Sequence, residues 1–418
     1  AAVGALYEVL LPRLKELNLW ELYTTAELPL CRVLAEMELA GCRVDKGALV
    51  SFGEMLSEKA NALEQNIYSM AGEEFNINSP KQLGEILFGK LGLPHGKKTK
   101  TGWSTNADVL EKLRYEAPIV GAVLEYRQYA KLKSTYADGL LKAMDPDGRI
   151  RTRFQMTVTD TGRLSSREPN LQNIPTRTDL GSEIRKMFIP AAGCVLVDAD
   201  YSQIELRLLA HISGDTAMRA AFTSGADIHT ATAAQVFHVD PADVTHEMRR
   251  RAKAVNFGIV YGISAFSLSQ AEAKAYMEAY FATFPGVRKY MDDVVARAKE
   301  QGYVETLFHR RRELPEIRSS NFNLRSFGER VALNMPIQGT AADIMKLAMV
   351  AVERRLKEEL PSAKLVLQVH DELIVECREE QAEAAARMLE EEMEQVVSLS
   401  VPLTAEAHWG KNWLEAKG

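Results

Sequence analysis

Apolar residues recur at helical spacing through the first third of the chain and at strand spacing soon after it. Positions three or four residues apart are apolar through residues 1–45 and most of residues 46–145, which predicts two helical regions, the first ending at Gly41. A turn signal at residues 145–148 is followed by alternation of apolar and polar positions through residues 150–156. That alternation predicts a half-buried strand.

A second strand pattern is the short apolar run of residues 194–199, which is typical of a buried strand. Asp200 follows it directly, where a strand end can present a carboxylate to a metal ion. Ser202 and Glu205 have the spacing of a capping box, which predicts that a helix begins there. The stretch therefore supports two interpretations, a metal-binding strand end and an ordinary helix start.

The C-terminal part mixes helix and strand patterns. A helix pattern begins near Arg325, and Pro336 predicts a break in it. Residues 365–377 contain two β-rich runs around His370-Asp371-Glu372, which predicts a hairpin with three polar residues at its turn. An acidic helix and a last strand over residues 401–408 complete the pattern.

Residues 245–262 combine a helix pattern with a row of functional groups. Thr245 is a suitable N-cap, and neither proline nor glycine interrupts the run as far as Phe257. Arg249, Lys253 and Phe257 are four residues apart and therefore share one stripe of the predicted helix. Two cations and an aromatic ring on one stripe suit the triphosphate and the flat base of a nucleotide. A solvated basic face followed by a core phenylalanine is the ordinary alternative.

Two further stretches are polar and irregular. Residues 161–175 are rich in amide, hydroxyl and guanidinium groups, so they form either a surface loop or a platform of hydrogen-bond donors. Residues 96–102 place three lysines between two glycines, which suits contacts to phosphates and almost equally a solvated loop. The donors suited to minor-groove acceptors are Arg163, Asn170, Gln172 and Asn173, and the three lysines are Lys97, Lys98 and Lys100.

Composition narrows the class of protein without deciding its function. The 418 residues are 46% hydrophobic and 26% charged, as expected of globular domains. The net charge of −6 argues against a uniformly basic nucleic-acid coat but permits a local basic groove. Four scattered cysteines form no Cys-x-x-Cys pair, which argues against a zinc site and predicts free thiols. Because no apolar run of membrane length and no leader pattern is present, we expect a soluble protein without a signal peptide or membrane association, and free thiols are typical of a reducing cytoplasm.

Together these patterns predict a site for nucleotidyl transfer. The strand predictions place Asp200 and Asp371 on neighbouring strands, and the predicted helix supplies the cations Arg249 and Lys253. Two aspartates can hold two magnesium ions about 3.5 to 4 Å apart, one at the attacking oxygen and one at the leaving oxygen. We therefore expect two Mg²⁺ ions as cofactors.

Several ordered motifs resemble those of the bacterial DNA polymerase I family, also called family A DNA polymerases. The resemblance covers nearly the whole chain from about residue 20 onward and corresponds to the polymerase portion of that family. The motifs are Asp200-Tyr201-Ser202-Gln203-Ile204-Glu205, the series Arg249, Lys253, Phe257 and Tyr261-Gly262, the triplet His370-Asp371-Glu372, residues 161–175, and Gln338-Gly339-Thr340-Ala341-Ala342-Asp343.

The resemblance implies an α+β, mostly helical fold with right-hand polymerase architecture: an antiparallel-sheet palm, helical fingers and a helical thumb. It implies a DNA-directed DNA polymerase of replication or repair that adds deoxynucleotides to a primer 3′-hydroxyl and releases pyrophosphate. Primed template DNA and deoxynucleoside triphosphates would be its partners, and it would act as a monomer. The implied parts are an N-terminal helical segment leading into the palm (1–45), the thumb (46–145), the first part of the palm (146–208), the fingers (209–324) and the second part of the palm (325–418).

The resemblance also implies roles for individual residues. Catalytic roles fall on Asp200, Asp371, Lys253 and Glu372, with Asp200, Asp371 and the Tyr201 carbonyl as metal ligands. Nucleotide contacts fall on Arg249, Lys253, Phe257, Tyr261, His229, Gln203 and Glu205, of which Glu205 would block a 2′-hydroxyl. Primer and template contacts fall on Arg163, Asn170, Gln172, Asn173, Gln338 and His370, with backbone contacts from Lys97, Lys98 and Lys100.

Two alternatives stay open. A single-subunit RNA polymerase shares the palm and a similar helix, but such an enzyme must admit the 2′-hydroxyl, and Glu205 and Phe257 argue against it. A non-catalytic nucleic-acid binding protein with a polymerase fold would have lost a metal aspartate, whereas Asp200 and Asp371 are both present. No acidic exonuclease motif is found, so we expect no proofreading from this chain.

Overall fold

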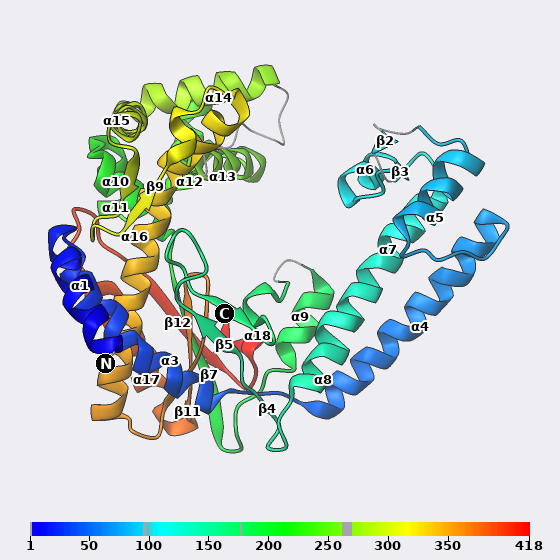
Figure 1. The fold of residues 1–418 in the computed structure, drawn as a ribbon, viewed down its shortest axis with the longest axis horizontal. Coiled ribbons are helices and arrows are strands. Elements are labelled where there is room, and N and C mark those ends of the chain that lie inside the picture. The colour runs from blue at the N-terminus through cyan, green and yellow to red at the C-terminus, as the bar shows by residue number, and fades with distance from the viewer. Residues whose placement is uncertain (1, 95–97, 100–101, 176–177, 261–269) are drawn as a thin grey trace. The chain divides into compact units, whose positions relative to one another are not determined.

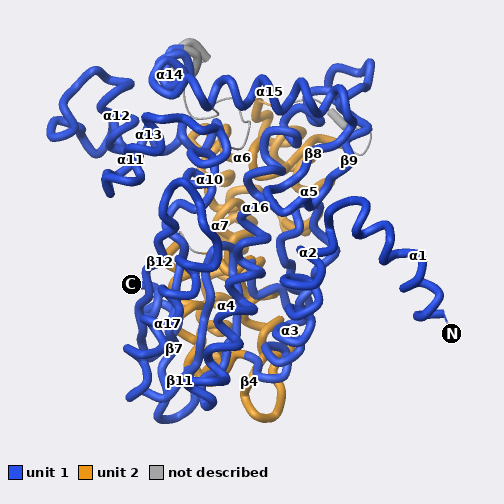
Figure 2. Tube along the Cα trace, turned by 90° about the vertical axis from the view of Figure 1, so that its left-hand side faces the viewer, with its two compact units in different colours: residues 1–41, 152–172, 190–418 blue, residues 42–151, 173–189 orange. Residues whose placement is uncertain are grey.

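The computed structural model of the chain describes residues 2–94, 98–99, 102–175, 178–260 and 270–418 (Figure 1). Two compact units are present (Figure 2). Unit 1 contains residues 1–41, 152–172 and 190–418, and unit 2 contains residues 42–151 and 173–189. Each unit is therefore assembled from separate stretches of sequence. The domain boundaries expected from the sequence remain predictions.

Unit 1 mixes helices with short strands, which confirms the predicted α+β, mostly helical class. Its helices are α1 (Ala2–Glu16), α2 (Trp20–Leu22), α3 (Leu28–Ala40), α10 (Ile204–Ser213), α11 (Thr216–Thr223), α12 (Ile228–Phe237), α13 (His246–Val260), α14 (Gln270–Thr283), α15 (Pro285–Gln301), α16 (Phe322–Glu359), α17 (Ala382–Gln395) and α18 (Trp413–Ala416). Its strands are β5 (Arg153–Gln155), β6 (Ser165–Arg167), β7 (Cys194–Tyr201), β8 (Tyr303–Glu305), β9 (Arg311–Glu313), β10 (Lys364–Val369), β11 (Glu372–Arg378) and β12 (Ala405–Gly410).

A four-stranded antiparallel sheet in the order β10-β11-β7-β12 forms the centre of unit 1. The register sets Asp200 of β7 opposite Glu372 of β11 on one side and opposite Glu406 of β12 on the other. Most residues of β7, β10 and β11 are buried, as expected of strands that helices cover. The register therefore fixes which side chains meet at the end of the sheet.

The strand and hairpin predictions are largely confirmed. The strand expected at residues 194–199 is present and extends to Tyr201, and the hairpin expected at residues 365–377 is formed by β10 and β11. The first helical region ends at Gly41, as predicted, with a backbone φ of 61° that suits glycine. The last strand is displaced, because β12 begins at Ala405 rather than at residue 401.

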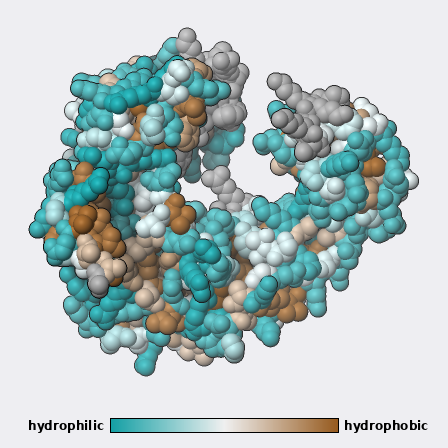
Figure 3. All heavy atoms as spheres, viewed as in Figure 1, coloured by the Kyte–Doolittle hydropathy of each residue, from teal (hydrophilic) through white to brown (hydrophobic). Residues whose placement is uncertain are grey.

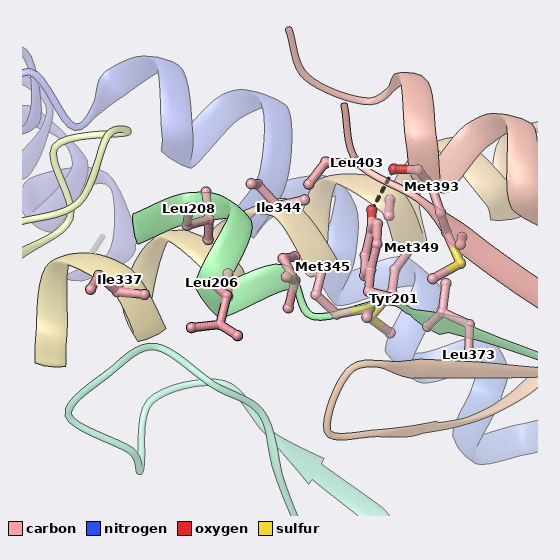
Figure 4. Close-up of a cluster of buried hydrophobic side chains, with 14 of the residues drawn as sticks. Tyr201, Leu206, Leu208, Ile337, Ile344, Met345, Met349, Leu373, Met393 and Leu403 are labelled. Atoms are coloured by element: carbon pink, nitrogen blue, oxygen red, sulfur yellow. Dashed lines mark hydrogen bonds between the residues drawn. The ribbon is translucent and has the colours of Figure 1, made fainter. Parts of the chain in front are cut away.

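Tyr201 anchors the end of β7 in the hydrophobic core. Its ring is 4% exposed and lies among the core side chains labelled in Figure 4, which include Met349 and Leu373. Its hydroxyl donates a hydrogen bond to the Met393 carbonyl of α17 at 2.6 Å (Figure 4). Helix α17 also packs against β7 and β12. The strand end that carries Asp200 is therefore held rigidly.

The break predicted at Pro336 is wrong, because α16 continues through it from Phe322 to Glu359. A proline inside a helix lacks an N–H and crowds the preceding turn. Here the surrounding positions, including Ala332 and Ile337, are buried, and the Thr340 hydroxyl donates to the Pro336 carbonyl at 2.5 Å. Tertiary packing of a central helix outweighs the local preference.

Unit 2 is mostly helical and has its own hydrophobic core, in which α4 packs against α7. Helix α4 begins at a good N-cap, since the Asp45 carboxylate accepts from the Ala48 N–H at 2.9 Å. The elements of unit 2 are β1 (Cys42–Arg43), α4 (Lys46–Ala71), α5 (Pro80–Gly84), β2 (Lys98–Thr99), β3 (Gly102–Trp103), α6 (Ala107–Lys112), α7 (Pro118–Leu132), α8 (Gly139–Ala143), β4 (Arg149–Ile150) and α9 (Asp179–Lys186).

The single strand predicted over residues 150–156 is wrong. The stretch forms two short strands in different sheets, β4 paired with β1 and β5 paired with β6. Between them the Thr152 hydroxyl donates to the Pro169 carbonyl at 2.7 Å, and Thr152 is buried. The alternating pattern is real, but this polar side-chain contact interrupts the ladder that one strand would need.

Polar and apolar side chains are unevenly distributed over the surface. The face shown in Figure 3 is mostly hydrophilic, with apolar side chains gathered at the left over α1. Those of Val3, Leu6 and Val9 are more than half exposed. Within the described part of the chain, no helix is both long enough and apolar enough to cross a bilayer.

Candidate functional site

Asp200 and Asp371 meet at one end of the central sheet. Asp200 is the second-last residue of β7, and Asp371 lies in the turn between β10 and β11. The Tyr201 N–H donates to the Asp371 carbonyl at 3.0 Å, so the backbones beside the two carboxylates are joined directly. Glu372 lies opposite Asp200 in the register. Three carboxylates singled out in the sequence are thereby brought together.

The turn that carries Asp371 is held by side-chain amides. His370 has a φ of 52°, which is a left-handed conformation. Residues other than glycine adopt this conformation only at a cost in free energy. Its carbonyl accepts from Gln368 Nε2 at 2.6 Å. Gln172 Nε2 in turn donates to the Gln368 carbonyl at 3.2 Å and to its side-chain oxygen at 3.1 Å. Gln172, expected to contact DNA, therefore also braces this turn.

Neighbouring carboxylates contribute to a raised pKa at Asp371. Burial, with contributions from Glu205, Asp200 and Glu372, raises the pKa of Asp371 to about 6 against the opposing effect of Arg163. Several carboxylates held this close repel one another, and a cation relieves that repulsion. The electrostatics of the sheet end therefore favour the binding of positive charge.

Arg163 and Glu205 form an ion pair beside this cluster. Arg163 Nη2 lies 2.5 Å from Glu205 Oε1, and Glu205 is only 5% exposed. The other carboxylate oxygen, Oε2, is buried and has no hydrogen-bond partner among the described residues. Arg163, expected to contact DNA, and Glu205, expected to select the nucleotide, are therefore joined by one ion pair. A pocket of about 40 Å³ is lined by Arg163, Gln172, His370 and Asp371.

The capping-box interpretation of Ser202 and Glu205 is wrong. Helix α10 begins at Ile204, and its N-cap is Gln203, whose φ of 56° is left-handed and whose side chain makes no capping bond. The Ser202 N–H instead donates to the Thr404 carbonyl at 2.9 Å. The end of the strand and the Glu205 carboxylate therefore form tertiary contacts, and they do not cap the N-terminus of α10.

Lys417 lies at the same end of the sheet and was not singled out in the sequence. Its ammonium is 2.9 Å from Asp200 Oδ2 and also pairs with Glu372 Oε2. Burial acts to lower the pKa of Lys417, but Glu372, Asp198 and Asp200 outweigh it, and the pKa is raised. No motif marks this lysine. It reaches the carboxylates because α18 contacts β7.

The helix prediction for residues 245–262 is confirmed over the described part by α13, His246–Val260. The Thr245 hydroxyl accepts from the Met248 N–H at 3.2 Å, as expected of an N-cap. Arg249 is half-buried and lies 2.5 Å from the Asp227 carboxylate at the start of α12. Lys253, one turn later, is exposed. Asp227 was not singled out in the sequence.

His229 and Phe257 lie side by side at the α12–α13 contact, with ring centroids 5.8 Å apart. His229 is 2% exposed, and its Nδ1 is 2.9 Å from Nδ2 of Asn256. Burial, together with Lys253 and Arg249, lowers the pKa of His229 to about 4 against the opposing effect of Asp227. His229 is therefore neutral at physiological pH, and an imidazole there acts as a hydrogen-bonding group and not as a cation.

The remaining expected DNA contacts are distributed over both units. Asn170 is exposed, and its side-chain oxygen accepts from the Ser166 hydroxyl and the Gln172 N–H, both at 3.0 Å. Asn173 belongs to unit 2, is exposed, and accepts from the Tyr136 hydroxyl through its carbonyl. Gln338 is half-buried on α16. Lys97, Lys100, Tyr261 and the side chain of Lys98 lie outside the described residues.

The donor set at the sheet end fits hard divalent cations in its chemistry. Asp200, Asp371 and Glu372 present carboxylate oxygens, which Mg²⁺ prefers. The ammonium of Lys417 at Asp200 also indicates that these oxygens attract a cation. Among the described residues, no group of three or more His, Cys, Asp or Glu side chains is arranged to hold a metal ion.

The chain is similar in sequence to bacterial DNA polymerases. The family model for DNA polymerase family A matches residues 46–415. The chain is 54% identical over 425 residues to DNA polymerase I of Geobacillus stearothermophilus, covering 100% of this chain and 48% of that protein. It is 52% identical over 424 residues to DNA polymerase I of Bacillus subtilis (strain 168), with 100% and 48% coverage. The chain thus spans about half the length of these curated relatives.

A solved structure supports the same fold. The POL domain of Pol1 from M. smegmatis, in complex with DNA primer-template and dNTP, matches with a TM-score of 0.94 and 43% sequence identity. The match covers 100% of this chain and 75% of that one. The polymerase fold implied by the sequence motifs is therefore confirmed.

Proposed function

Because the chain belongs to DNA polymerase family A, we propose that it is a DNA-directed DNA polymerase that extends a primer on a DNA template. The observation that carries this proposal is the meeting of Asp200 and Asp371 at the end of the β7–β11 ladder, with Tyr201 N–H bound to the Asp371 carbonyl. The similar M. smegmatis domain was solved with primer-template and dNTP, which supports the same two partners here.

Asp200 and Asp371, with the Tyr201 carbonyl, would hold two Mg²⁺ ions, and Glu372 would support them. When bound, the ions lower the pKa of the primer 3′-hydroxyl and stabilise the negative charge that develops on the departing pyrophosphate. The chain's own contribution is rigidity: Tyr201 is fixed in the core by its bond to Met393, and the His370 turn is braced by Gln368 and Gln172. Rigid placement of the carboxylates avoids reorganisation during the reaction.

Arg249, Lys253 and His229 would bind the triphosphate. Arg249 would exchange Asp227 for a phosphate oxygen, a change between two charge-assisted bonds. Lys253 is exposed, one turn along the same stripe, and is suited to donate a proton to the leaving pyrophosphate. Phe257 and Tyr261 would pack on the incoming nucleotide and near the templating base. Helix α13 would close over a correctly paired nucleotide. The shape of the base pair would then control assembly of the reaction site.

The remaining candidate residues would select the sugar of the nucleotide and hold the DNA in position. Glu205, with Gln203 nearby, would exclude a 2′-hydroxyl, while Arg163 holds Glu205 and faces the carboxylate cluster. The primer and template would be contacted by Arg163, Asn170, Gln172, Asn173, Gln338 and His370, and by Lys97, Lys98 and Lys100. We further propose that the protein acts as a monomer in the cytoplasm, in replication or repair.

Primer extension tests the proposal. The chain is incubated with a labelled primer on a DNA template and Mg²⁺, with deoxynucleotides and ribonucleotides in separate reactions and with a second primer that has a mismatched 3′ end. We expect extension by deoxynucleotides, little by ribonucleotides, and no shortening of the mismatched primer. Extension by ribonucleotides alone would identify an RNA polymerase, and binding of the duplex without any extension would identify a non-catalytic protein.

A further inference from the structure

Lys417 forms ion pairs with two carboxylates of the candidate metal site. Its ammonium lies 2.9 Å from Asp200 Oδ2 and also pairs with Glu372 Oε2, the two carboxylates that face each other across the β7–β11 ladder. Asp198, two residues earlier on β7, adds a third negative charge to its surroundings.

The position of Lys417 is fixed by the fold. Strand β12 pairs with β7 in the register that puts Glu406 opposite Asp200, and α18 follows β12 and contacts both strands. Within α18, Trp413 is 1% exposed and Ala416 is 0% exposed, so the helix is anchored in the core directly before Lys417. Packing of α18 therefore places the backbone at Lys417 beside the carboxylates.

We propose that Lys417 is a positioning residue for the metal site: it holds the carboxylates of Asp200 and Glu372 together before metal binds and competes with divalent cations for them. This inference rests on the proposed function. The physical reason is that an ammonium and a metal ion seek the same carboxylate oxygens and repel each other at short range. Metal binding then requires the ammonium to give up Asp200. The Lys417 ammonium would thus hold together carboxylates that otherwise repel one another. It would also limit the affinity of these carboxylates for a metal ion.

The test is Mn²⁺ binding to the full chain without DNA, measured from the electron paramagnetic resonance signal of free Mn²⁺. For Lys417→Met we expect Mn²⁺ to bind about three- to tenfold more tightly, since the ammonium that repels the divalent cation is removed. Lys417→Arg retains the charge and should bind Mn²⁺ as the unchanged protein does. Thermal unfolding of each variant checks that the fold is intact.

Lys411→Met is the matched control. Lys411 also lies in the C-terminal region, but its ammonium pairs with the exposed Glu379 at 2.5 Å, away from the carboxylate cluster. Its loss should leave Mn²⁺ affinity unchanged. If Lys417→Met binds Mn²⁺ no more tightly than Lys411→Met, or more weakly, the inference is overturned.

Asp371→Asn in the same assay separates this inference from the proposed function. Weaker Mn²⁺ binding by Asp371→Asn, together with unchanged binding by Lys417→Met, would overturn the role of Lys417 alone. Equal Mn²⁺ binding by Asp371→Asn and the unchanged protein would overturn the metal assignment and the role of Lys417 together. A second readout is the Mg²⁺ concentration that gives half-maximal extension, which should fall for Lys417→Met.

Discussion

Arg163 Nη2 lies 2.5 Å from Glu205 Oε1, which joins a loop rich in DNA-contact candidates to the first turn of α10. Glu205 is buried and Arg163 is about one-third exposed, so the pair has one face in the protein and one toward solvent. Burying a carboxylate is costly unless a cation accompanies it. Arg163 therefore fixes where the Glu205 carboxylate points.

The first prediction concerns selection of the sugar. Glu205→Ala should lower the preference for deoxynucleotides over ribonucleotides by about tenfold or more, because the group that meets the 2′ position is removed. Arg163→Met should lower the same preference, because Glu205 loses the partner that orients it. The ratio of kcat/KM values for the two nucleotide classes measures both effects. An unchanged ratio in Arg163→Met would mean that the ion pair does not position Glu205.

The second prediction separates neighbouring arginines on α13. Arg249→Ala should raise the KM for deoxynucleoside triphosphates about 10- to 100-fold, since a charge-assisted bond to phosphate is worth about 1.5 to 3 kcal/mol. Arg250→Ala is the control, because Arg250 is 69% exposed and pairs with Glu247 one turn earlier. Steady-state extension kinetics provide the measurement. Equal effects of the two substitutions would contradict a directed phosphate contact by Arg249.

The third prediction is a pH dependence of stability. Burial lowers the pKa of His229 to about 4, below its ordinary value of 6.5. As the pH falls from 6.5 toward 4, the unfolded chain takes up a proton at this position and the folded chain does not, so the free energy of unfolding decreases. His229→Gln cannot take up that proton. Between pH 7 and pH 5 the unchanged protein should therefore lose more thermal stability than His229→Gln, and equal losses would contradict a buried neutral His229.

The fourth prediction concerns a buried ionic network in unit 1. Asp343, which is fully buried, accepts from Arg310 Nε and from the Thr306 hydroxyl, both at 2.7 Å. Glu27 pairs with the same Arg310 and with Lys346, the latter at 2.7 Å. Replacing one member of such a network leaves a buried charge uncompensated. The motif residue Asp343 therefore has a structural role.

Asp343→Asn should lower the free energy of unfolding by about 3 kcal/mol or more, because it removes the fully buried one of the two carboxylates that pair with Arg310. Asp293→Asn is the control, since Asp293 pairs with Lys289 on an exposed helix face at 2.6 Å and should cost less than about 1 kcal/mol. Thermal unfolding of the two variants gives the comparison. A loss for Asp343→Asn no larger than for Asp293→Asn would refute the structural role.

Local patterns predict the elements that carry the candidate site. The apolar run at residues 194–199, the hairpin at residues 365–377 and the capped helix after Thr245 all form, because their signals lie within a few neighbouring residues. These elements place Asp200 at the end of a strand and Asp371 in the turn of a hairpin. The bond between Tyr201 and Asp371 shows how the register brings them together.

Features that depend on distant packing could not be read from those patterns. The partners of Glu205 and Arg249, which are Arg163 and Asp227, are 42 and 22 residues away in sequence. Lys417 reaches Asp200 across 217 positions through the pairing of β12 with β7. The expected break at Pro336 failed for the same reason, since burial in the core outweighs a local preference.

The measurement that tests the central claim most directly is primer extension by Asp371→Asn beside the unchanged protein, with duplex binding measured on the same preparations. Asparagine keeps the size of the side chain and removes its charge, so the sheet and the turn at His370 should remain intact. We predict that extension falls by about three orders of magnitude or more while the affinity for primed DNA changes by less than about threefold. Near-normal extension by Asp371→Asn would contradict the assignment of this carboxylate to the reaction.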